Sequence, residues 1–292
     1  MSLDMERVEM FRNVWSKLIV PVRPGPEGLA LYCSQMQRLP QKRILVLGAT
    51  PELVDMALEL NADKVVSVER NPEIIAAMRQ LGTRDWSKVQ LIAGDWLEER
   101  SDFYSSFNCI ICDGGLLFLH YPEQWKILFK LVYSYLTPGG VFIAKEWAEP
   151  TGERDYDSFI KKMISCFEAE SKNKSRKETM ELYIRLASEL RLATFINTTQ
   201  KDGSFDQTIL LERLDSLIEE LKRKFADPEL VQITEAALKY LARSQSGTTD
   251  VVTGVRFEVA DKLLSACGFI SEHFPLPDPP IAEANYMFVA RK

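Results

Sequence analysis

The chain has 292 residues, of which 46% are hydrophobic and 27% are charged, and its formal net charge is −6. This is the composition of an ordinary globular protein, and its acidic balance argues against a broad nucleic-acid surface. No apolar run reaches the roughly 18 residues that a transmembrane helix needs, and the charged N-terminus is unlike a secretory signal. Five scattered cysteines fit a reducing compartment. We expect a cytoplasmic protein with no nucleic-acid or membrane partner.

The N-terminal part of the chain predicts helices. Residues 5–21 are amphipathic, and residues 26–38 predict a second helix. The proline-rich stretch "PVRPGPEG" (21–28) predicts a bend between them. We expect residues 1–40 to form a helical segment or lid that precedes the main domain.

Strands and helices then alternate along the chain. "RILVLG" (43–48) is almost entirely apolar, which is typical of a strand buried on both faces. A helix over 51–61 follows, where Thr50 is able to cap it and Pro51 takes its first position. The alternation continues with strands at 64–69, 88–95, 107–115 and 141–147 and helices at 72–82 and 122–136. This pattern predicts an open parallel sheet with helices on both faces.

The alternation stops after Pro150. Residues 153–246 predict about four helices with no strand between them, and in the clearest of these one face carries Leu211, Leu214, Ile218, Leu221 and Phe225. We expect residues 151–254 to form a helical insertion, either a cap or an association surface that supports a homodimer. The same apolar face would equally pack on neighbouring helices of its own chain.

The C-terminal residues return to the main domain. A helix is predicted over 257–269, followed by strands at 270–274 and 285–292. Residues 41–150 and 255–292 are therefore expected to form one α/β unit on either side of the insertion.

Polar residues stand where the predicted parallel strands end, and a ligand of such a sheet binds beyond these ends. The residues at the four strand ends are Gly48, Ala49 and Thr50, then Glu69, then Asp95 and Trp96, then Asp113 and Gly114. An acid at position 69 can accept hydrogen bonds from both hydroxyls of a ribose. The turn after the first strand lacks the G-x-G-x-x-G pattern of dinucleotide sites, and Pro51 and Glu52 disfavour a diphosphate. We expect a nucleoside without phosphate.

The segment 40–147, with the tail 257–292, resembles class I S-adenosylmethionine-dependent methyltransferases. "VVSVERNPEII" (65–75) is similar to the family motif whose acid binds the ribose, and "LIAGDW" (91–96) to the motif that meets the adenine. "YLTPGGVFIAKE" (135–146) is similar to the turn before the fifth strand. The first motif departs from the family, which usually has three glycines and an acid two residues before the first. Here Val46 stands where the family usually has the acid, and the turn has one glycine, Gly48.

The resemblance implies a Rossmann-like α/β fold. The sheet would have seven strands, mostly parallel with an antiparallel last strand, and a helical insertion between strands 5 and 6. It also implies S-adenosylmethionine as cofactor and S-adenosylhomocysteine as product. The implied cofactor-binding residues are Gly48, Ala49, Thr50, Glu69, Arg70, Asp95, Trp96, Asp113 and Gly114.

Methyl transfer is a direct displacement, so positioning supplies much of the acceleration, and a general base helps when the acceptor is a hydroxyl. His120, after the fourth strand, and Glu146, at the end of the fifth, are the candidate catalytic residues. His120 would otherwise be an exposed or helix-capping residue, and Glu146 would otherwise pair with Lys145 or an arginine. Tyr121 and Trp147, with Arg23 from the N-terminal segment, are the candidate substrate residues. We expect a small-molecule acceptor, methylated at oxygen rather than nitrogen.

Two further observations bear on function. Cys109 and Cys112 form a C-x₂-C pair inside a predicted strand, where the period of two points them to opposite faces. No second pair with metal spacing accompanies them, so we expect no metal. The single-glycine turn supports an alternative, a non-catalytic protein with a degenerate methyltransferase fold that binds the nucleoside or a partner. An aminopropyltransferase and a macromolecular acceptor are further alternatives.

Overall fold

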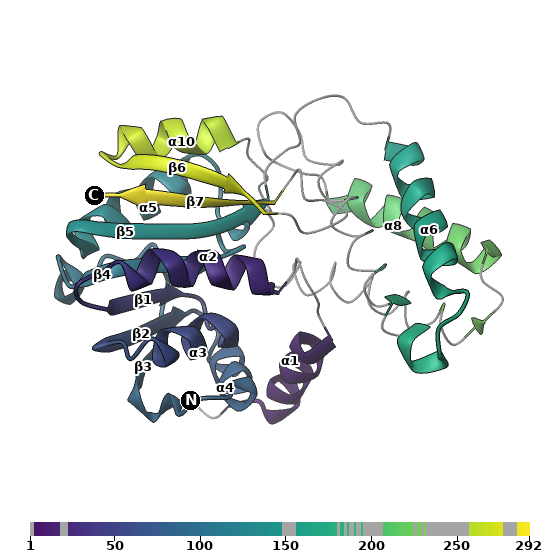
Figure 1. Cartoon of the computed structure of the whole chain (residues 1–292), viewed down its shortest axis with the longest axis horizontal. Helices are drawn as coiled ribbons and strands as arrows, with labels where there is room; N and C mark the ends of the chain where they lie inside the picture. Colours follow the sequence, from purple (N-terminus) through teal and green to yellow (C-terminus); the bar gives the residue numbers. More distant parts are fainter. Residues whose placement is uncertain are drawn as a thin grey trace.

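Figure 1 shows the chain as a computed structural model, which describes residues 3–17, 23–147, 156–179, 207–224, 257–276 and 285–292, and scattered positions between 182 and 231. A seven-stranded sheet lies at its centre. The strands are β1 (Arg43–Leu47), β2 (Lys64–Glu69), β3 (Val89–Ala93), β4 (Phe107–Asp113), β5 (Leu136–Trp147), β6 (Ile270–Pro275) and β7 (Asn285–Arg291).

The strand order is β3-β2-β1-β4-β5-β7-β6. The pairs β1–β2, β1–β4, β2–β3 and β4–β5 are parallel. β7 is antiparallel to both of its neighbours, and Figure 1 shows it lying between β5 and β6. β6 therefore runs in the same direction as β1 to β5, and only β7 is reversed. The predicted fold class is confirmed.

Helices cover both faces of this sheet, as the alternating pattern predicted. The helices of the α/β unit and the N-terminal segment are α1 (Met5–Lys17), α2 (Pro26–Gln37), α3 (Pro51–Glu59), α4 (Pro72–Leu81), α5 (Glu123–Tyr135) and α10 (Phe257–Ala266). Side chains of α1 to α4 belong to one buried cluster, and those of α5 and α10 belong to another. Alternate residues of β1 enter the two clusters, Ile44 and Val46 one and Leu45 and Leu47 the other, because the sheet lies between them.

Two helices of the insertion lie in the described residues, α6 (Tyr156–Ser171) and α8 (Gln207–Lys224). They stand apart from the sheet in Figure 1, and Lys224 Nζ of α8 lies 3.3 Å from Glu168 Oε2 of α6. Leu214, Ile218 and Leu221 are buried, so the predicted apolar face of α8 already packs within its own chain. The side chains of Leu211 and Phe225 lie outside the described residues. A homodimer through the insertion stays a prediction, and it would need a different face.

Two local predictions need correction. β5 begins at Leu136, because Leu136 pairs with Phe107 before the register shifts at the Pro-Gly-Gly turn, so the strand starts five residues earlier than predicted. Thr50 occupies the capping position of α3, but its side chain makes no capping hydrogen bond. No helix in the described part of the chain is both long enough and apolar enough to cross a membrane.

Candidate functional site

The turn after β1 is held tightly by β2. Gly48 has φ of +105°, a backbone conformation that favours glycine. Its N–H donates to the carbonyl of Val68 at 2.8 Å, and the buried hydroxyl of Ser67 donates to the Gly48 carbonyl at 2.7 Å. Both peptide groups of Gly48 are therefore bonded within the sheet. Ala49 and Thr50 follow it as buried residues, and Ala49 belongs to the core on the α3 side.

Glu69 stands half-buried at the carboxyl end of β2. Its Oε1 accepts a hydrogen bond from the backbone N–H of Asn71 at 2.9 Å, which orients the carboxyl group. Burial raises the pKa of Glu69, and the N–H bonds from Asn71 and Arg70 oppose that rise. The exposed Arg70 lies with its Nη1 4.0 Å from Asp95 Oδ2. The acidic group at this strand end is where the nucleoside prediction requires it.

Asp95 and Trp96 lie beyond the end of β3. Asp95 Oδ1 accepts from the backbone N–H of Leu97 at 2.9 Å. Trp96 Nε1 donates to the Val68 carbonyl at 2.7 Å, so this carbonyl receives both the Gly48 N–H and the indole N–H. The indole ring thereby lies against the Gly48 turn.

A buried ion pair joins the ends of β4 and β5. Lys145 Nζ lies 3.0 Å from Asp113 Oδ1, and both side chains are only 1% exposed. Tyr32 of α2 donates its hydroxyl to the Cys112 carbonyl at 2.5 Å and accepts from the Lys145 N–H at 3.0 Å. Burial, followed by the nearby Asp113, raises the pKa of Tyr32. Gly114, with φ of +65°, donates its N–H to the Lys145 carbonyl at 2.8 Å.

Glu146 points to the opposite face of β5, because neighbouring strand residues alternate. It does not pair with Lys145, which is paired with Asp113. Glu146 Oε1 accepts from the Leu116 N–H at 2.9 Å, in the short 3₁₀ turn η3 (Leu116–Phe118). Its Oε2 is buried and has no hydrogen-bond partner within the part of the chain that the structure describes. Burial raises the pKa of Glu146 to about 8, and the Leu116 N–H opposes this.

Of the other predicted site residues, His120 faces solvent and Tyr121 packs against Trp125 of α5. His120 is exposed, and its backbone N–H donates to Gln124 Oε1 at 2.8 Å at the start of α5. Tyr121 is half-buried, and its ring meets Trp125 edge-on with 5.7 Å between centroids. The side chain of Trp147 lies outside the described residues. Of the two candidate catalytic residues, Glu146 is therefore buried and held by a hydrogen bond, whereas His120 faces solvent; the catalytic role of either residue stays a prediction.

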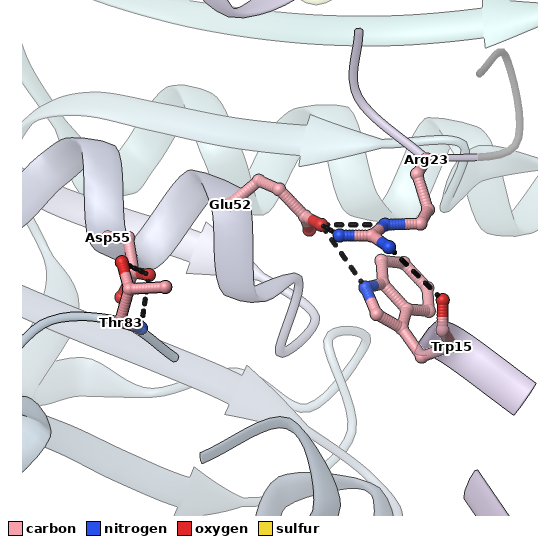
Figure 2. A network of polar contacts seen from close by, with 5 residues as sticks. All are labelled: Trp15, Arg23, Glu52, Asp55 and Thr83. Carbon is pink, nitrogen blue, oxygen red and sulfur yellow. Dashed lines mark hydrogen bonds and ion pairs between the residues drawn. The ribbon is translucent and has the colours of Figure 1, made fainter. Parts of the chain in front are cut away.

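Arg23 bonds to Glu52, as Figure 2 shows. Arg23 Nε donates to Glu52 Oε1 at 2.7 Å, Nη2 reaches the same oxygen, and Nη1 donates to the Trp15 carbonyl at 3.4 Å. The indole N–H of Trp15 also donates to Glu52 at 3.4 Å. This network ties the N-terminal segment to the first turn of α3. Arg23 was predicted to contact the substrate, and in this structure its guanidinium group bonds to Glu52.

Figure 2 also shows Asp55 of α3, which holds the loop after α4. Asp55 accepts from the Thr83 N–H at 2.6 Å, from the Thr83 hydroxyl at 2.7 Å and from Trp86 Nε1 at 2.6 Å. With its carboxylate bonded this fully, we interpret Asp55 as structural.

The described residues offer no site for a metal ion, since no three of their His, Cys, Asp or Glu side chains gather closely enough. Cys109 and Cys112 belong to the two different cores, as their spacing in a strand predicted.

The partners that fix the site were not predicted from the sequence. The predicted site residues did not include Ser67, Lys145 and Tyr32. Ser67 and Lys145 are polar residues inside apolar strands, and this pattern indicates that each has a buried polar partner. The link from Tyr32 to β4 and β5 joins residues 80 and 113 positions apart, and no local pattern indicates it.

No family model matches this chain, and no curated protein matches it. Solved structures do match. An S-adenosylmethionine-dependent methyltransferase from Mesorhizobium loti has a TM-score of 0.50 at 15% identity, covering 92% of this chain and 98% of its own. A protein from Nostoc punctiforme named as an O-methyltransferase has a TM-score of 0.52 at 13% identity, covering 98% of this chain and 60% of its own.

A third solved structure, from Rhodobacter sphaeroides, is named as a Zn-dependent alcohol dehydrogenase. Its TM-score is 0.57 at 17% identity, and 98% of each chain is covered. The strand order shows whether the fold of this chain is that of a methyltransferase or that of a dinucleotide-binding dehydrogenase. A dinucleotide-binding sheet has the order 3-2-1-4-5-6, whereas here an antiparallel β7 lies between β5 and β6. The chain has the class I methyltransferase fold. Within this fold, Gly48, Glu69 and Asp113 lie at the carboxyl ends of β1, β2 and β4.

Proposed function

We propose that the chain transfers a methyl group from S-adenosylmethionine to an oxygen atom of a small molecule. The observation that carries this proposal is the buried Oε2 of Glu146, which has no partner among the described residues. Glu146 bonds to Leu116, the residue after Gly115, and Gly115 packs against Trp96. An unpaired carboxyl oxygen therefore lies close to the carboxyl ends of β1 and β4, where a ligand of such a sheet is expected.

The residues at these strand ends fit a nucleoside that carries no phosphate. Phosphate binding at a helix start needs free backbone N–H groups, but the Gly48 N–H is bonded to Val68 and Pro51 has none. Glu69 instead offers an oriented carboxyl group that suits ribose hydroxyls. Gly48, Glu69 and Asp95 are the residues that would hold the cofactor.

S-adenosylmethionine, when bound, supplies a methyl group on a positively charged sulfur, which leaves as a neutral thioether. The chain's own contribution is the proton transfer. Deprotonated Glu146 accepts the proton of the acceptor hydroxyl at Oε2 while Oε1 stays bonded to the Leu116 N–H. Its pKa of about 8 lies near neutral pH, which suits a general base. Because an amine acceptor can react as its free base without such help, this arrangement favours an oxygen acceptor.

Incubation with S-adenosylmethionine carrying a labelled methyl group, and with separate panels of small alcohols, phenols and amines, tests the proposal. We expect label in a hydroxylated product. Glu146→Gln should lower kcat by about 100-fold or more with unchanged affinity for S-adenosylhomocysteine. Glu98→Gln, an exposed acid, is the matched control. Transfer that survives Glu146→Gln would overturn the role of Glu146, and transfer confined to amines would overturn the choice of oxygen.

A non-catalytic cofactor-binding protein is the second candidate. It is favoured by the Arg23–Glu52 contact, which places a carboxylate in the first turn of α3, and by the Lys145–Asp113 pair, which neutralises an acid at the sheet edge. Cofactor binding without label transfer to any acceptor in the panels would support this candidate.

A further inference from the structure

The indole of Trp96 reaches from the end of β1 to the end of β4. A Cβ atom added to Gly48 would lie 3.7 Å from Trp96 Cζ2. A Cβ added to Gly115 would lie 2.7 Å from Cη2 and 2.9 Å from Cζ3, which is closer than atoms can approach. The six-membered ring therefore takes the space that a side chain at residue 115 would need. It packs on the core on the side of α5 and α10.

This position is the place where a ligand of such a sheet is expected. Strand order reverses between β1 and β4, since β2 and β3 extend the sheet on one side and β5 extends it on the other. Ligands of open parallel sheets bind in the crevice outside the carboxyl ends of the strands at this reversal. Trp96 Nε1 is bonded to the carbonyl of Val68, the residue before Glu69, so the indole also adjoins the acid that suits a ribose.

The contacts that hold the indole allow it to leave. Its polar contact is one hydrogen bond to the Val68 carbonyl, and that carbonyl keeps the Gly48 N–H at 2.8 Å when the indole moves away. No buried acceptor is then left without a partner. Trp96 is only half-buried, so part of the residue already faces solvent.

We propose that the indole of Trp96 occupies the nucleobase subsite of this crevice and that a nucleoside binds by displacing it. The indole is a fused pair of planar rings with one N–H donor, so it resembles a purine in size and shape. The inference rests on the proposed function, because it takes the crevice as the nucleoside site. It adds a competitor within the chain, so the apparent affinity for the cofactor equals the intrinsic affinity multiplied by the fraction of time that the subsite is open.

Calorimetric titration of Trp96→Ala, Trp96→Phe and the wild type with S-adenosylhomocysteine, adenosine and methionine tests this inference. If the indole fills the subsite about nine-tenths of the time, its removal lowers the apparent Kd about tenfold. We expect this gain for S-adenosylhomocysteine and for adenosine, a smaller gain with Trp96→Phe, and none for methionine. Trp86→Phe is the matched control, because Trp86 donates its N–H to Asp55 on the other face of the sheet.

Weaker or unchanged binding of adenosine by Trp96→Ala would overturn the inference and leave the proposed function standing, with Trp96 as a stacking platform or a bystander. Absence of binding by both the wild type and Trp96→Ala would overturn the proposed function itself.

Tryptophan fluorescence of the wild type tests the same inference if Trp96→Ala fails to fold. Saturation with S-adenosylhomocysteine should shift tryptophan emission to the red, as the indole enters water, and Trp96→Phe should abolish the shift. A blue shift or no shift contradicts displacement.

Discussion

Lys145 and Glu146 are neighbours in β5 with opposite surroundings. Lys145 is buried beside Asp113, and each charge has its counter-charge. Glu146 is buried on the other face, where burial outweighs the N–H groups of Leu116 and Leu117 and the charge of Lys145 and raises the pKa of its carboxyl group. Burial of a carboxyl group disfavours its charged form. A single step along the strand thus separates a buried ion pair from a buried acid whose pKa is raised.

This acid should make stability depend on pH. The pKa of Glu146 is about 8 in the folded chain against an ordinary value of 4.5, so the folded state keeps a proton that the unfolded state releases. Its contribution to the free energy of unfolding is fully present below about pH 4 and is lost as pH rises to about 8. Glu146→Gln stays neutral and should remove that decline. Urea unfolding at several pH values checks this, and parallel pH curves for the two proteins would contradict it.

At the scale of single residues, the sequence predicted where the acidic residues lie, but it did not predict the groups to which they bond. Glu69 and Glu146 were predicted at strand ends, because apolar runs mark where a buried strand stops. Their bonds depend on the register between strands and on turns such as η3, which a single strand does not encode. For the same reason the sequence did not predict that Lys145 faces Asp113, 32 residues away.

At the scale of elements, the side chain of Tyr32 ties α2 to two strands of the sheet. The hydroxyl of Tyr32 bonds to β4 through Cys112 and to β5 through Lys145, and the ring is fully buried. The N-terminal segment is tied a second time, by Arg23 to α3. Tyr32 thus meets the carboxyl ends of β4 and β5, near the candidate site, and the expectation that residues 1–40 form a lid stays a prediction.

Tyr32→Phe should loosen this attachment. It leaves the Cys112 carbonyl and the Lys145 N–H without their bonds, and an unsatisfied buried polar group costs about 1 to 3 kcal/mol. We expect the free energy of unfolding to fall by about that amount, measured by urea denaturation. Tyr104→Phe, at a residue that is 43% exposed, is the control and should change little. Equal stability of the two variants would show that the Tyr32 hydroxyl does not anchor α2.

Most helices and strands were predicted from the hydrophobic pattern of the sequence, since apolar strands and amphipathic helices have distinct repeats. The exceptions occur at turns. The Pro-Gly-Gly turn lies inside β5, because Lys292 bonds across it to Gly139 and Gly140, and this pairing comes from the far end of the chain.

At the scale of the whole molecule, the sheet separates two cores and brings the strand ends to one edge. The order of the strands places β1 and β4 side by side, so Gly48, Trp96 and Gly115 meet although they are far apart in sequence. The strand order also distinguishes this fold from a dinucleotide-binding sheet. The resemblance of residues 257–292 to the methyltransferase tail implied this order, because it implied an antiparallel last strand. The proposed acceptor is expected to depend on the insertion, whose sequence carries no motif that identifies it.

The central claim is that this edge binds the nucleoside of S-adenosylmethionine through Glu69. The measurement that tests it most directly is calorimetric titration with S-adenosylhomocysteine of the wild type, Glu69→Ala and the exposed control Glu98→Ala. We predict a Kd on the order of micromolar for the wild type and the control, and a loss of at least about tenfold for Glu69→Ala, because the ribose loses charge-assisted hydrogen bonds. Equal affinity of all three proteins, or no binding by the wild type at millimolar ligand, would contradict the claim.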